Sequence, residues 1–161
     1  MRYLMKQRLF SLGDDFVIKD ENGQDAFYVD GKVFSIGNKL SFQDMQGKEL
    51  ALIQQKLLSF GPTYAIDYPG GSATVKKHLF TLFNCSFTVD VPGPDDLEAQ
   101  GNLTDHEYSF SCGGRTVANV SKQWFALSDT YGVEIADGED DVLILASTVV
   151  IDMCCHGDRK R

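Results

Sequence analysis

One cysteine and one histidine lie near each other along the chain, a pairing that can supply a nucleophile and its base. Cys112 is followed by Gly113 and Gly114, and His106 precedes it by six residues. A catalytic thiol needs such a base, together with a third group that orients the base. No third group lies at recognisable spacing, and the three histidines lack metal-ligand spacing with cysteine. We predict that the chain is not an enzyme, with a hydrolase or redox site at Cys112 and His106 as the alternative.

Basic side chains that suit an anionic headgroup gather in one internal cluster. Lys76, Lys77 and His78 are consecutive, and Lys56 is a further candidate for the same side of the protein. Clustered ammonium groups bind the phosphates of anionic lipids at membrane surfaces. Lysines also keep exposed strands from pairing with other chains, which gives the cluster a structural alternative. We predict Lys56, Lys76 and Lys77 as the lipid-headgroup candidates.

The composition favours a single globular domain over residues 1–161. Of the 161 residues, 43% are hydrophobic and 11% are aromatic, which predicts a folded core and not disorder. The formal net charge of −8 argues against broad binding to nucleic acid, so no nucleic-acid partner is expected. The first residues lack a signal-peptide core, and none of the four cysteines forms a Cys-x-x-Cys pair. These features predict reduced thiols in a cytoplasmic protein.

The most hydrophobic part of the sequence lies near its end, where eleven of the fourteen residues from 142 to 155 are apolar. A membrane span needs about 20 apolar residues, whereas fourteen helical residues reach only about 21 Å. Asp152 lies inside the segment, and an ionised carboxylate is costly in a bilayer. A strand of this length would show alternation, which is absent. We predict a helix over about 139–155 that is buried in the protein and does not span a membrane.

The rest of the chain has the pattern of short strands joined by turns. Three Asp-x-x-Gly units begin at Asp20, Asp44 and Asp129, with the residues of a type I turn at their first and fourth positions. Runs rich in β-branched and aromatic residues flank each unit, and glycine and proline separate the later runs. We predict about twelve antiparallel strands, with a hairpin turn at each Asp-x-x-Gly unit.

A closed barrel would protect the edges of so many strands, but side chains alone cannot fill a barrel of about twelve strands. The apolar helix supplies the missing filling. We therefore predict a mainly β protein, a closed antiparallel barrel of about twelve strands that encloses a central hydrophobic C-terminal helix. Trp124 is expected to pack against this helix, with an exposed pair of Trp124 and Phe125 as the alternative. A filled lumen disfavours ligand carriage and enclosed catalysis, so binding is expected at outer faces, loops and barrel ends.

Several stretches resemble the LURP-one-related family, which belongs to the tubby C-terminal-like superfamily together with the phospholipid scramblases. The matching stretches are residues 6–16, 31–32, 34–37, 40–56, 122–125 and 129–135, followed by the terminal helix. The resemblance implies a twelve-stranded barrel around a central C-terminal helix, in agreement with the strand count. Tubby-like relatives bind phosphoinositides and scramblase relatives associate with membranes, whereas the activity of the LURP-one-related branch is poorly defined.

The acidic stretch from 129 to 141 resembles the calcium-binding segment that precedes the terminal helix in scramblases. Asp129, Asp137, Glu139 and Asp141 fall at comparable places, and Asp140 is a further acidic neighbour. Calcium binds six to eight oxygen ligands, of which these carboxylates would supply several. The stretch lacks the ligand order of an EF-hand loop, and carboxylates at a helix start also serve as caps. Helix capping is thus the expected role of these carboxylates and no cofactor is expected, with calcium bound at Asp129, Asp137, Glu139 and Asp141 as the alternative.

These features predict a non-enzymatic cytoplasmic binding or scaffold protein, peripheral at most to a membrane surface. Its expected partner is an anionic lipid headgroup, such as that of a phosphoinositide, or another protein. A calcium-responsive scramblase-like protein is a further alternative, which the short helix and Asp152 disfavour.

Overall fold

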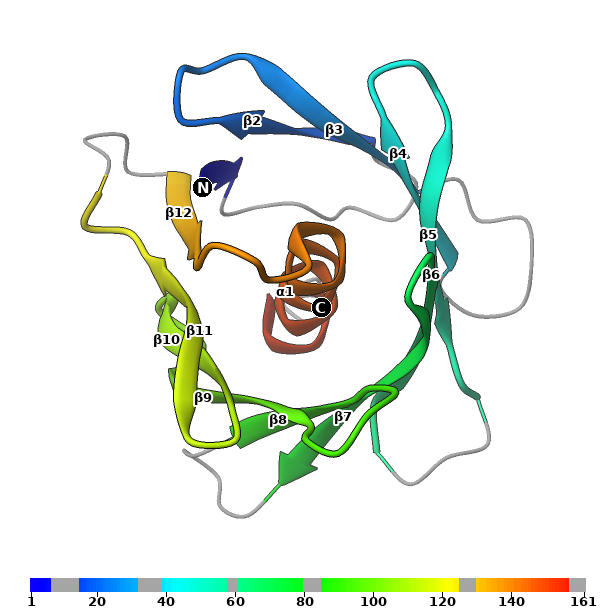
Figure 1. Cartoon of the computed structure of the whole chain (residues 1–161), viewed down its shortest axis with the longest axis vertical. Coiled ribbons are helices and arrows are strands. Elements are labelled where there is room, and N and C mark those ends of the chain that lie inside the picture. Colours follow the sequence, from blue (N-terminus) through cyan, green and yellow to red (C-terminus); the bar gives the residue numbers. More distant parts are fainter. Residues whose placement is uncertain (7–14, 32–38, 58–60, 80–84, 125–129, 157–161) are drawn as a thin grey trace.

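The computed structural model describes residues 1–6, 15–31, 39–57, 61–79, 85–124 and 130–156. Within these ranges lie twelve strands and one helix (Figure 1). The elements are β1 (Arg2–Lys6), β2 (Phe16–Asp20), β3 (Asp25–Asp30), β4 (Lys39–Asp44), β5 (Glu49–Gln55), β6 (Thr63–Tyr68), β7 (Gly71–Leu79), β8 (Cys85–Asp90), β9 (Leu97–Asn102), β10 (Glu107–Cys112), β11 (Arg115–Ser121), β12 (Thr130–Ile135) and α1 (Asp141–His156).

The strands form one closed antiparallel barrel in which each strand pairs with its neighbours along the chain. β1 closes the ring by pairing with β12, which sets Leu4 opposite Gly132 and Arg2 opposite Glu134. Figure 1 looks into the barrel and shows α1 inside the ring of strands. The predicted mainly β fold and the predicted central helix are both confirmed.

The helix forms the core of the barrel because most of its buried side chains are apolar, with Ser147, Thr148 and Asp152 as the buried polar exceptions. Five of its apolar side chains have no exposed surface, and each contributes to stability by leaving water, roughly 1.5–3 kcal/mol for a valine, leucine or isoleucine. They are Leu145, Ala146, Val149, Val150 and Ile151. No helix in the described part of the chain is long and apolar enough to cross a membrane.

Two of the three predicted Asp-x-x-Gly turns are confirmed. The Gly23 N–H donates to the Asp20 carbonyl at 3.0 Å, and the Gly47 N–H donates to the Asp44 carbonyl at 3.1 Å. Each aspartate side chain also accepts backbone N–H groups of its own turn, such as that of Gln46 at 2.9 Å from Asp44 Oδ1. Both glycines have positive φ, 78° and 84°, which a residue with a Cβ rarely adopts. The hairpins β2–β3 and β4–β5 therefore form where the turn chemistry predicts them.

The third predicted turn is wrong. Thr130, Tyr131 and Gly132 lie in β12, while Asp129 lies outside the described residues. β12 is paired on both sides, because Gly132 is in register with Leu4 of β1 and with Ser121 of β11. Two ladders of backbone hydrogen bonds outweigh the single bond that closes a local turn.

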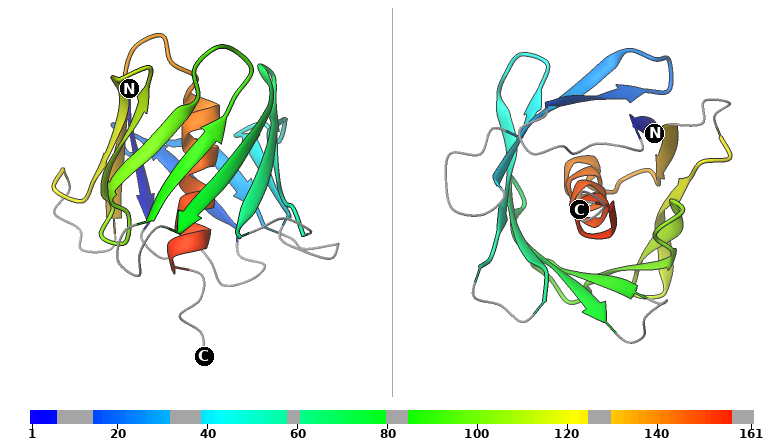
Figure 2. Two further views of the ribbon diagram at one scale, coloured as in Figure 1. Left: turned by 90° about the horizontal axis from the view of Figure 1, so that it is seen from below. Right: turned by 180° about the vertical axis from the view of Figure 1, so that it is seen from behind.

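The up-and-down order of the strands places every second connection at the same end of the barrel. The end where α1 begins, the helix-start end, consists of connections 21–24, 45–48, 69–70, 91–96, 113–114 and 136–140. The opposite end, where the last turn of α1 lies, is the helix-stop end. Figure 2 shows α1 running along the barrel from one end to the other.

Trp124 lies on the outer wall of the barrel, so its predicted packing against the helix is wrong. The Arg2 guanidinium lies 4.8 Å from the centre of the Trp124 ring and forms an ion pair with Glu134 at 2.5 Å. Arg2 and Glu134 point outward because their strand neighbours Tyr3 and Val133 are buried. Trp124 is half-buried and has Arg2 as a packing partner outside the lumen; a cation over an aromatic face near the surface contributes about 0.5–1 kcal/mol.

Candidate functional site

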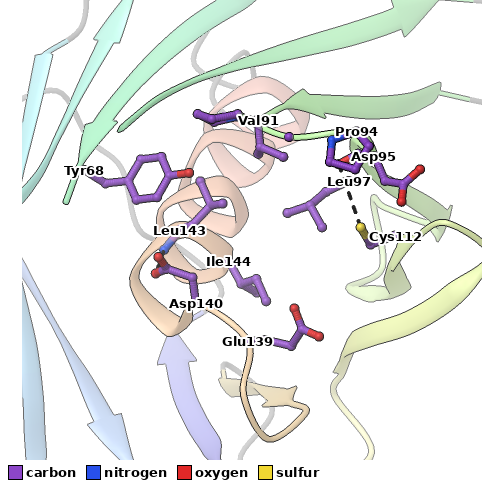
Figure 3. Close-up of a pocket in the computed structure, with 12 residues that line it drawn as sticks. Tyr68, Val91, Pro94, Asp95, Leu97, Cys112, Glu139, Asp140, Leu143 and Ile144 are labelled. Carbon is purple, nitrogen blue, oxygen red and sulfur yellow. Dashed lines mark hydrogen bonds between the residues drawn. The ribbon is translucent and has the colours of Figure 1, made fainter. Parts of the chain in front are cut away.

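A cavity of about 260 Å³ lies at the helix-start end, beside the first turn of α1 (Figure 3). Its apolar lining includes Val91, Pro92, Pro94, Leu97, Leu143 and Ile144, and its polar lining consists of Tyr68, Asp95, Cys112, Glu139 and Asp140. The cavity therefore combines an apolar wall with an acidic rim.

Strand ends and one connection position this lining. Tyr68 ends β6, Leu97 begins β9 and Cys112 ends β10, so the antiparallel order brings all three to the same end of the barrel. The connection 91–96 lies tightly against β7 because Gly71 has no side chain. A Cβ at Gly71 would lie 2.9 Å from Cγ of Pro92, closer than such atoms can approach.

Three acidic residues at the start of α1, Glu139, Asp140 and Asp141, each have a structural partner. Asp140 Oδ1 accepts the Leu143 N–H at 3.0 Å, which caps the first turn. The hydroxyl of Tyr3 donates to Asp141 Oδ2 at 2.5 Å. The pKa of Tyr3 is raised mainly by burial and, to a lesser extent, by this hydrogen bond. Arg115 pairs with Glu139 at 2.7 Å. These contacts fix the path by which the chain enters the barrel.

The calcium candidates are placed as follows. Asp137 is exposed, Glu139 and Asp141 are engaged with their partners, and Asp129 lies outside the described residues. Within the described residues, no group of three or more histidine, cysteine, aspartate or glutamate side chains is arranged to hold a metal ion. The acidic stretch thus has the contacts expected of helix capping, and calcium binding stays the untested alternative.

The three lysine candidates divide between the two faces of the barrel wall. Lys77 points toward the helix, with Nζ 3.5 Å from the Cys154 carbonyl, where a positive charge complements the C-terminal end of the helix dipole. Its neighbour Lys76 is exposed on the outer wall. Lys56 is also exposed and donates its backbone N–H to Thr63 at 2.8 Å, while Thr63 is opposite Lys76 in the sheet. Lys56 and Lys76 therefore lie near one another, and Lys77 is apart from them.

The proposed nucleophile and base do not meet. Cys112 ends β10 at the helix-start end and donates its S–H to the Asp95 carbonyl at 3.8 Å. His106 precedes β10 at the opposite end and is fully buried. The five residue steps of β10 between them span roughly 17 Å, so His106 is too far away to deprotonate Cys112.

His106 instead belongs to a buried polar cluster that sequence reasoning missed. Its Nε2 lies 2.9 Å from Oδ1 of Asp152, and the Tyr131 hydroxyl donates to Oδ2 of the same carboxylate. The rings of His106 and Tyr131 stack with centroids 4.2 Å apart. His106 has no exposed surface and Asp152 is 2% exposed, so the cluster lies between α1 and the wall with almost no access to water.

The physical signal for this cluster was Asp152 itself, since a carboxylate inside an apolar helix requires polar partners when it is buried. Nothing in the sequence identifies those partners, which come from β12 and from the connection before β10. Burial and the charge of Asp152 raise the pKa of Tyr131 well above its ordinary value of 10.0. The same two causes raise the pKa of Tyr108, which is also buried near the helix.

Comparison with known proteins agrees with the geometry. The family model described as LURP-one-related matches residues 1–152. The chain is 34% identical to the uncharacterized protein YxjI of Bacillus subtilis (strain 168) over 154 residues, which cover 96% of this chain and 93% of YxjI. An X-ray structure of an Arabidopsis thaliana protein has a TM-score of 0.64 at 18% identity, covering 93% of this chain and 88% of that one. This last likeness concerns the fold alone.

Proposed function

Because the chain belongs to the LURP-one-related family, we propose that it is a non-enzymatic cytoplasmic binding protein that recognises its partner with the ends and outer wall of its barrel. The observation that carries this proposal is the filled interior. Helix residues from Ile144 to Ile151 are 0–1% exposed, so α1 occupies the space in which wider barrels hold their ligands. Binding is left to the surface.

The separation of Cys112 from His106 supports a binding role over an enzymatic one. A nucleophile and its base need to be within hydrogen-bond reach or joined by one water. Here the thiol and the imidazole lie at opposite ends of β10. Labelling with a thiol reagent tests the enzymatic alternative, because a Cys112 that reacts far faster than Cys154 and Cys155 would favour it.

Lys56 and Lys76 support an anionic lipid headgroup as one partner of the outer wall. Thr63 lies between them in the sheet, so their backbones are two strand spacings apart, roughly 10 Å. Two ammonium groups at this spacing can contact phosphates at a membrane surface. With a net charge of −8, the chain would approach such a surface through this local face, as a peripheral protein.

Co-sedimentation with vesicles tests the lipid branch. The full chain should pellet at low salt with phosphatidylcholine vesicles that contain a phosphoinositide, and should stay in the supernatant with phosphatidylcholine alone. The double variant Lys56→Glu, Lys76→Glu should lose this pelleting. The matched control, Lys19→Glu with Lys48→Glu, makes the same charge change near the helix-start end. This control should still pellet with the phosphoinositide vesicles. Equal behaviour of the two double variants would exclude this face and leave a protein partner.

A further inference from the structure

The cavity beside the first turn of α1 has the size and lining of a pocket for one side chain. Small-molecule pockets have volumes of about 300–1,000 Å³, and this cavity, at about 260 Å³, lies below that range. Val91, Leu97, Leu143 and Ile144 give it an apolar wall. A leucine-sized or phenylalanine-sized side chain placed there would leave water, as the anchor residues of protein interfaces do.

The surface around this cavity is strongly negative. All six connections of the helix-start end are described, and their charged residues are Glu21, Lys48, Asp95, Asp96, Asp137, Glu139 and Asp140. One lysine thus stands among six carboxylates, of which Glu139 is paired with Arg115. Asp95 and Asp140 lie at the cavity itself, as Figure 3 shows. A surface of this sign attracts cationic partners and disfavours anionic ones.

We propose that the helix-start end binds a basic segment of another protein. One apolar side chain of that segment enters the cavity, and flanking lysine or arginine side chains lie against Asp95 and Asp140. A polypeptide fits better than a small amine because the acidic surface extends over connections far beyond the cavity. This inference rests on the proposed binding function and names the partner of one end of the barrel.

Three labelled peptides of equal length test the chemistry of the partner with the full chain. The first is Lys-Lys-Gly-Leu-Gly-Lys-Lys, the second has serine in place of leucine, and the third has glutamate in place of every lysine. Fluorescence anisotropy at low ionic strength should show the first binding about tenfold more tightly than the second, since a buried leucine is worth at least that factor. The third should not bind. Equal affinities for the first two peptides would overturn the role of the cavity.

A pair of charge-matched variants tests the location. Asp95→Asn with Asp140→Asn removes two charges at the cavity, and asparagine at 140 keeps the helix cap because it caps as well as aspartate. The control, Glu98→Gln with Asp105→Asn, removes two charges from the outer wall of β9 and the helix-stop end. The first double variant should bind the leucine peptide about tenfold more weakly, and the control should bind it normally. Equal weakening in both would overturn the site.

The vesicle experiment separates this inference from the proposed function. A chain that pellets with phosphoinositide vesicles but ignores all three peptides would overturn the basic-segment site and leave the proposed function standing. A chain that binds neither vesicles nor peptides would count against both. Melting temperatures of all variants, measured in parallel, identify any loss of binding that comes from unfolding.

Discussion

The imidazole Nε2 of His106 lies 2.9 Å from the carboxylate Oδ1 of Asp152, although 46 residues separate the two along the chain. His106 comes from the connection before β10, and Asp152 comes from the last part of α1. Tyr131 of β12 donates to the other carboxylate oxygen. Through these two contacts, the Asp152 carboxylate joins the helix both to β12 and to the connection before β10, inside a largely apolar core.

Removing the Asp152 carboxylate should destabilise the protein strongly. Asp152→Ala leaves His106 and the Tyr131 hydroxyl buried without their acceptor, and each buried polar group left without a hydrogen-bond partner costs about 1–3 kcal/mol. Urea unfolding monitored by circular dichroism measures the loss. Ser147→Ala is the matched control, because the Ser147 hydroxyl is also buried but donates only to the Leu143 carbonyl of its own helix. That control should lose less than about 1 kcal/mol, and an equal loss in both variants would contradict a special role for Asp152.

The buried tyrosines predict that stability falls at alkaline pH. Burial raises the pKa of Tyr131 and Tyr108 above the ordinary value of 10.0 that they have in the unfolded chain. Their contribution to stability is fully present below pH 10 and is lost as the pH rises above it, because the unfolded chain then releases protons that the folded chain retains. Urea midpoints measured from neutral pH upward should therefore drop above pH 10. Tyr131→Phe should lower stability at neutral pH and flatten the alkaline drop, and an unchanged slope would contradict this assignment.

Prediction from the sequence succeeded where a single element carries its own signal. The length, composition and Asp152 of the terminal segment identified a core helix, and the first two Asp-x-x-Gly units identified hairpins. It failed where the outcome depends on distant pairing, as at Gly132, which two neighbouring strands hold in β12. The partners of Asp152 could not be predicted either, because His106 and Tyr131 are far from it in the sequence and only the fold brings them together. The opposite orientations of Lys76 and Lys77 follow from the alternation of side chains along a strand. The position of Lys56 near Lys76 could not be predicted, because it depends on Thr63 of β6, which pairs with Lys76 on one side and accepts the Lys56 N–H on the other.

Calcium should leave the protein unchanged if the acidic stretch serves to start the helix. Glu139 is paired with Arg115, Asp141 accepts from Tyr3, and Asp140 caps Leu143. Gathering these carboxylates around one ion would break contacts that hold α1 in place. We expect millimolar calcium to give no binding heat in calorimetry and no shift in melting temperature. Binding heat that disappears in the variant Asp137→Asn, Glu139→Gln would establish the calcium site instead.

Removal of the helix should abolish folding of the whole barrel. A chain that ends at Asp141 lacks the apolar side chains that fill the lumen, of which Leu145, Val149 and Ile151 have no exposed surface. The inward faces of the strands would then enclose an empty space that dispersion contacts no longer fill. Circular dichroism and urea titration should show no cooperative transition for the truncated chain.

A single charge placed inside the lumen tests, in the full-length chain, whether folding of the barrel depends on the apolar packing of the helix. Ala146 has no exposed surface, so Ala146→Arg places a guanidinium among apolar side chains and should destabilise the barrel by several kcal/mol. Asp137→Arg introduces the same group at an exposed position and should leave the urea midpoint nearly unchanged. A truncated chain that still unfolds cooperatively, or an Ala146→Arg variant as stable as its control, would show that the barrel stands without its helix. The filled lumen would then no longer argue for binding at the surface.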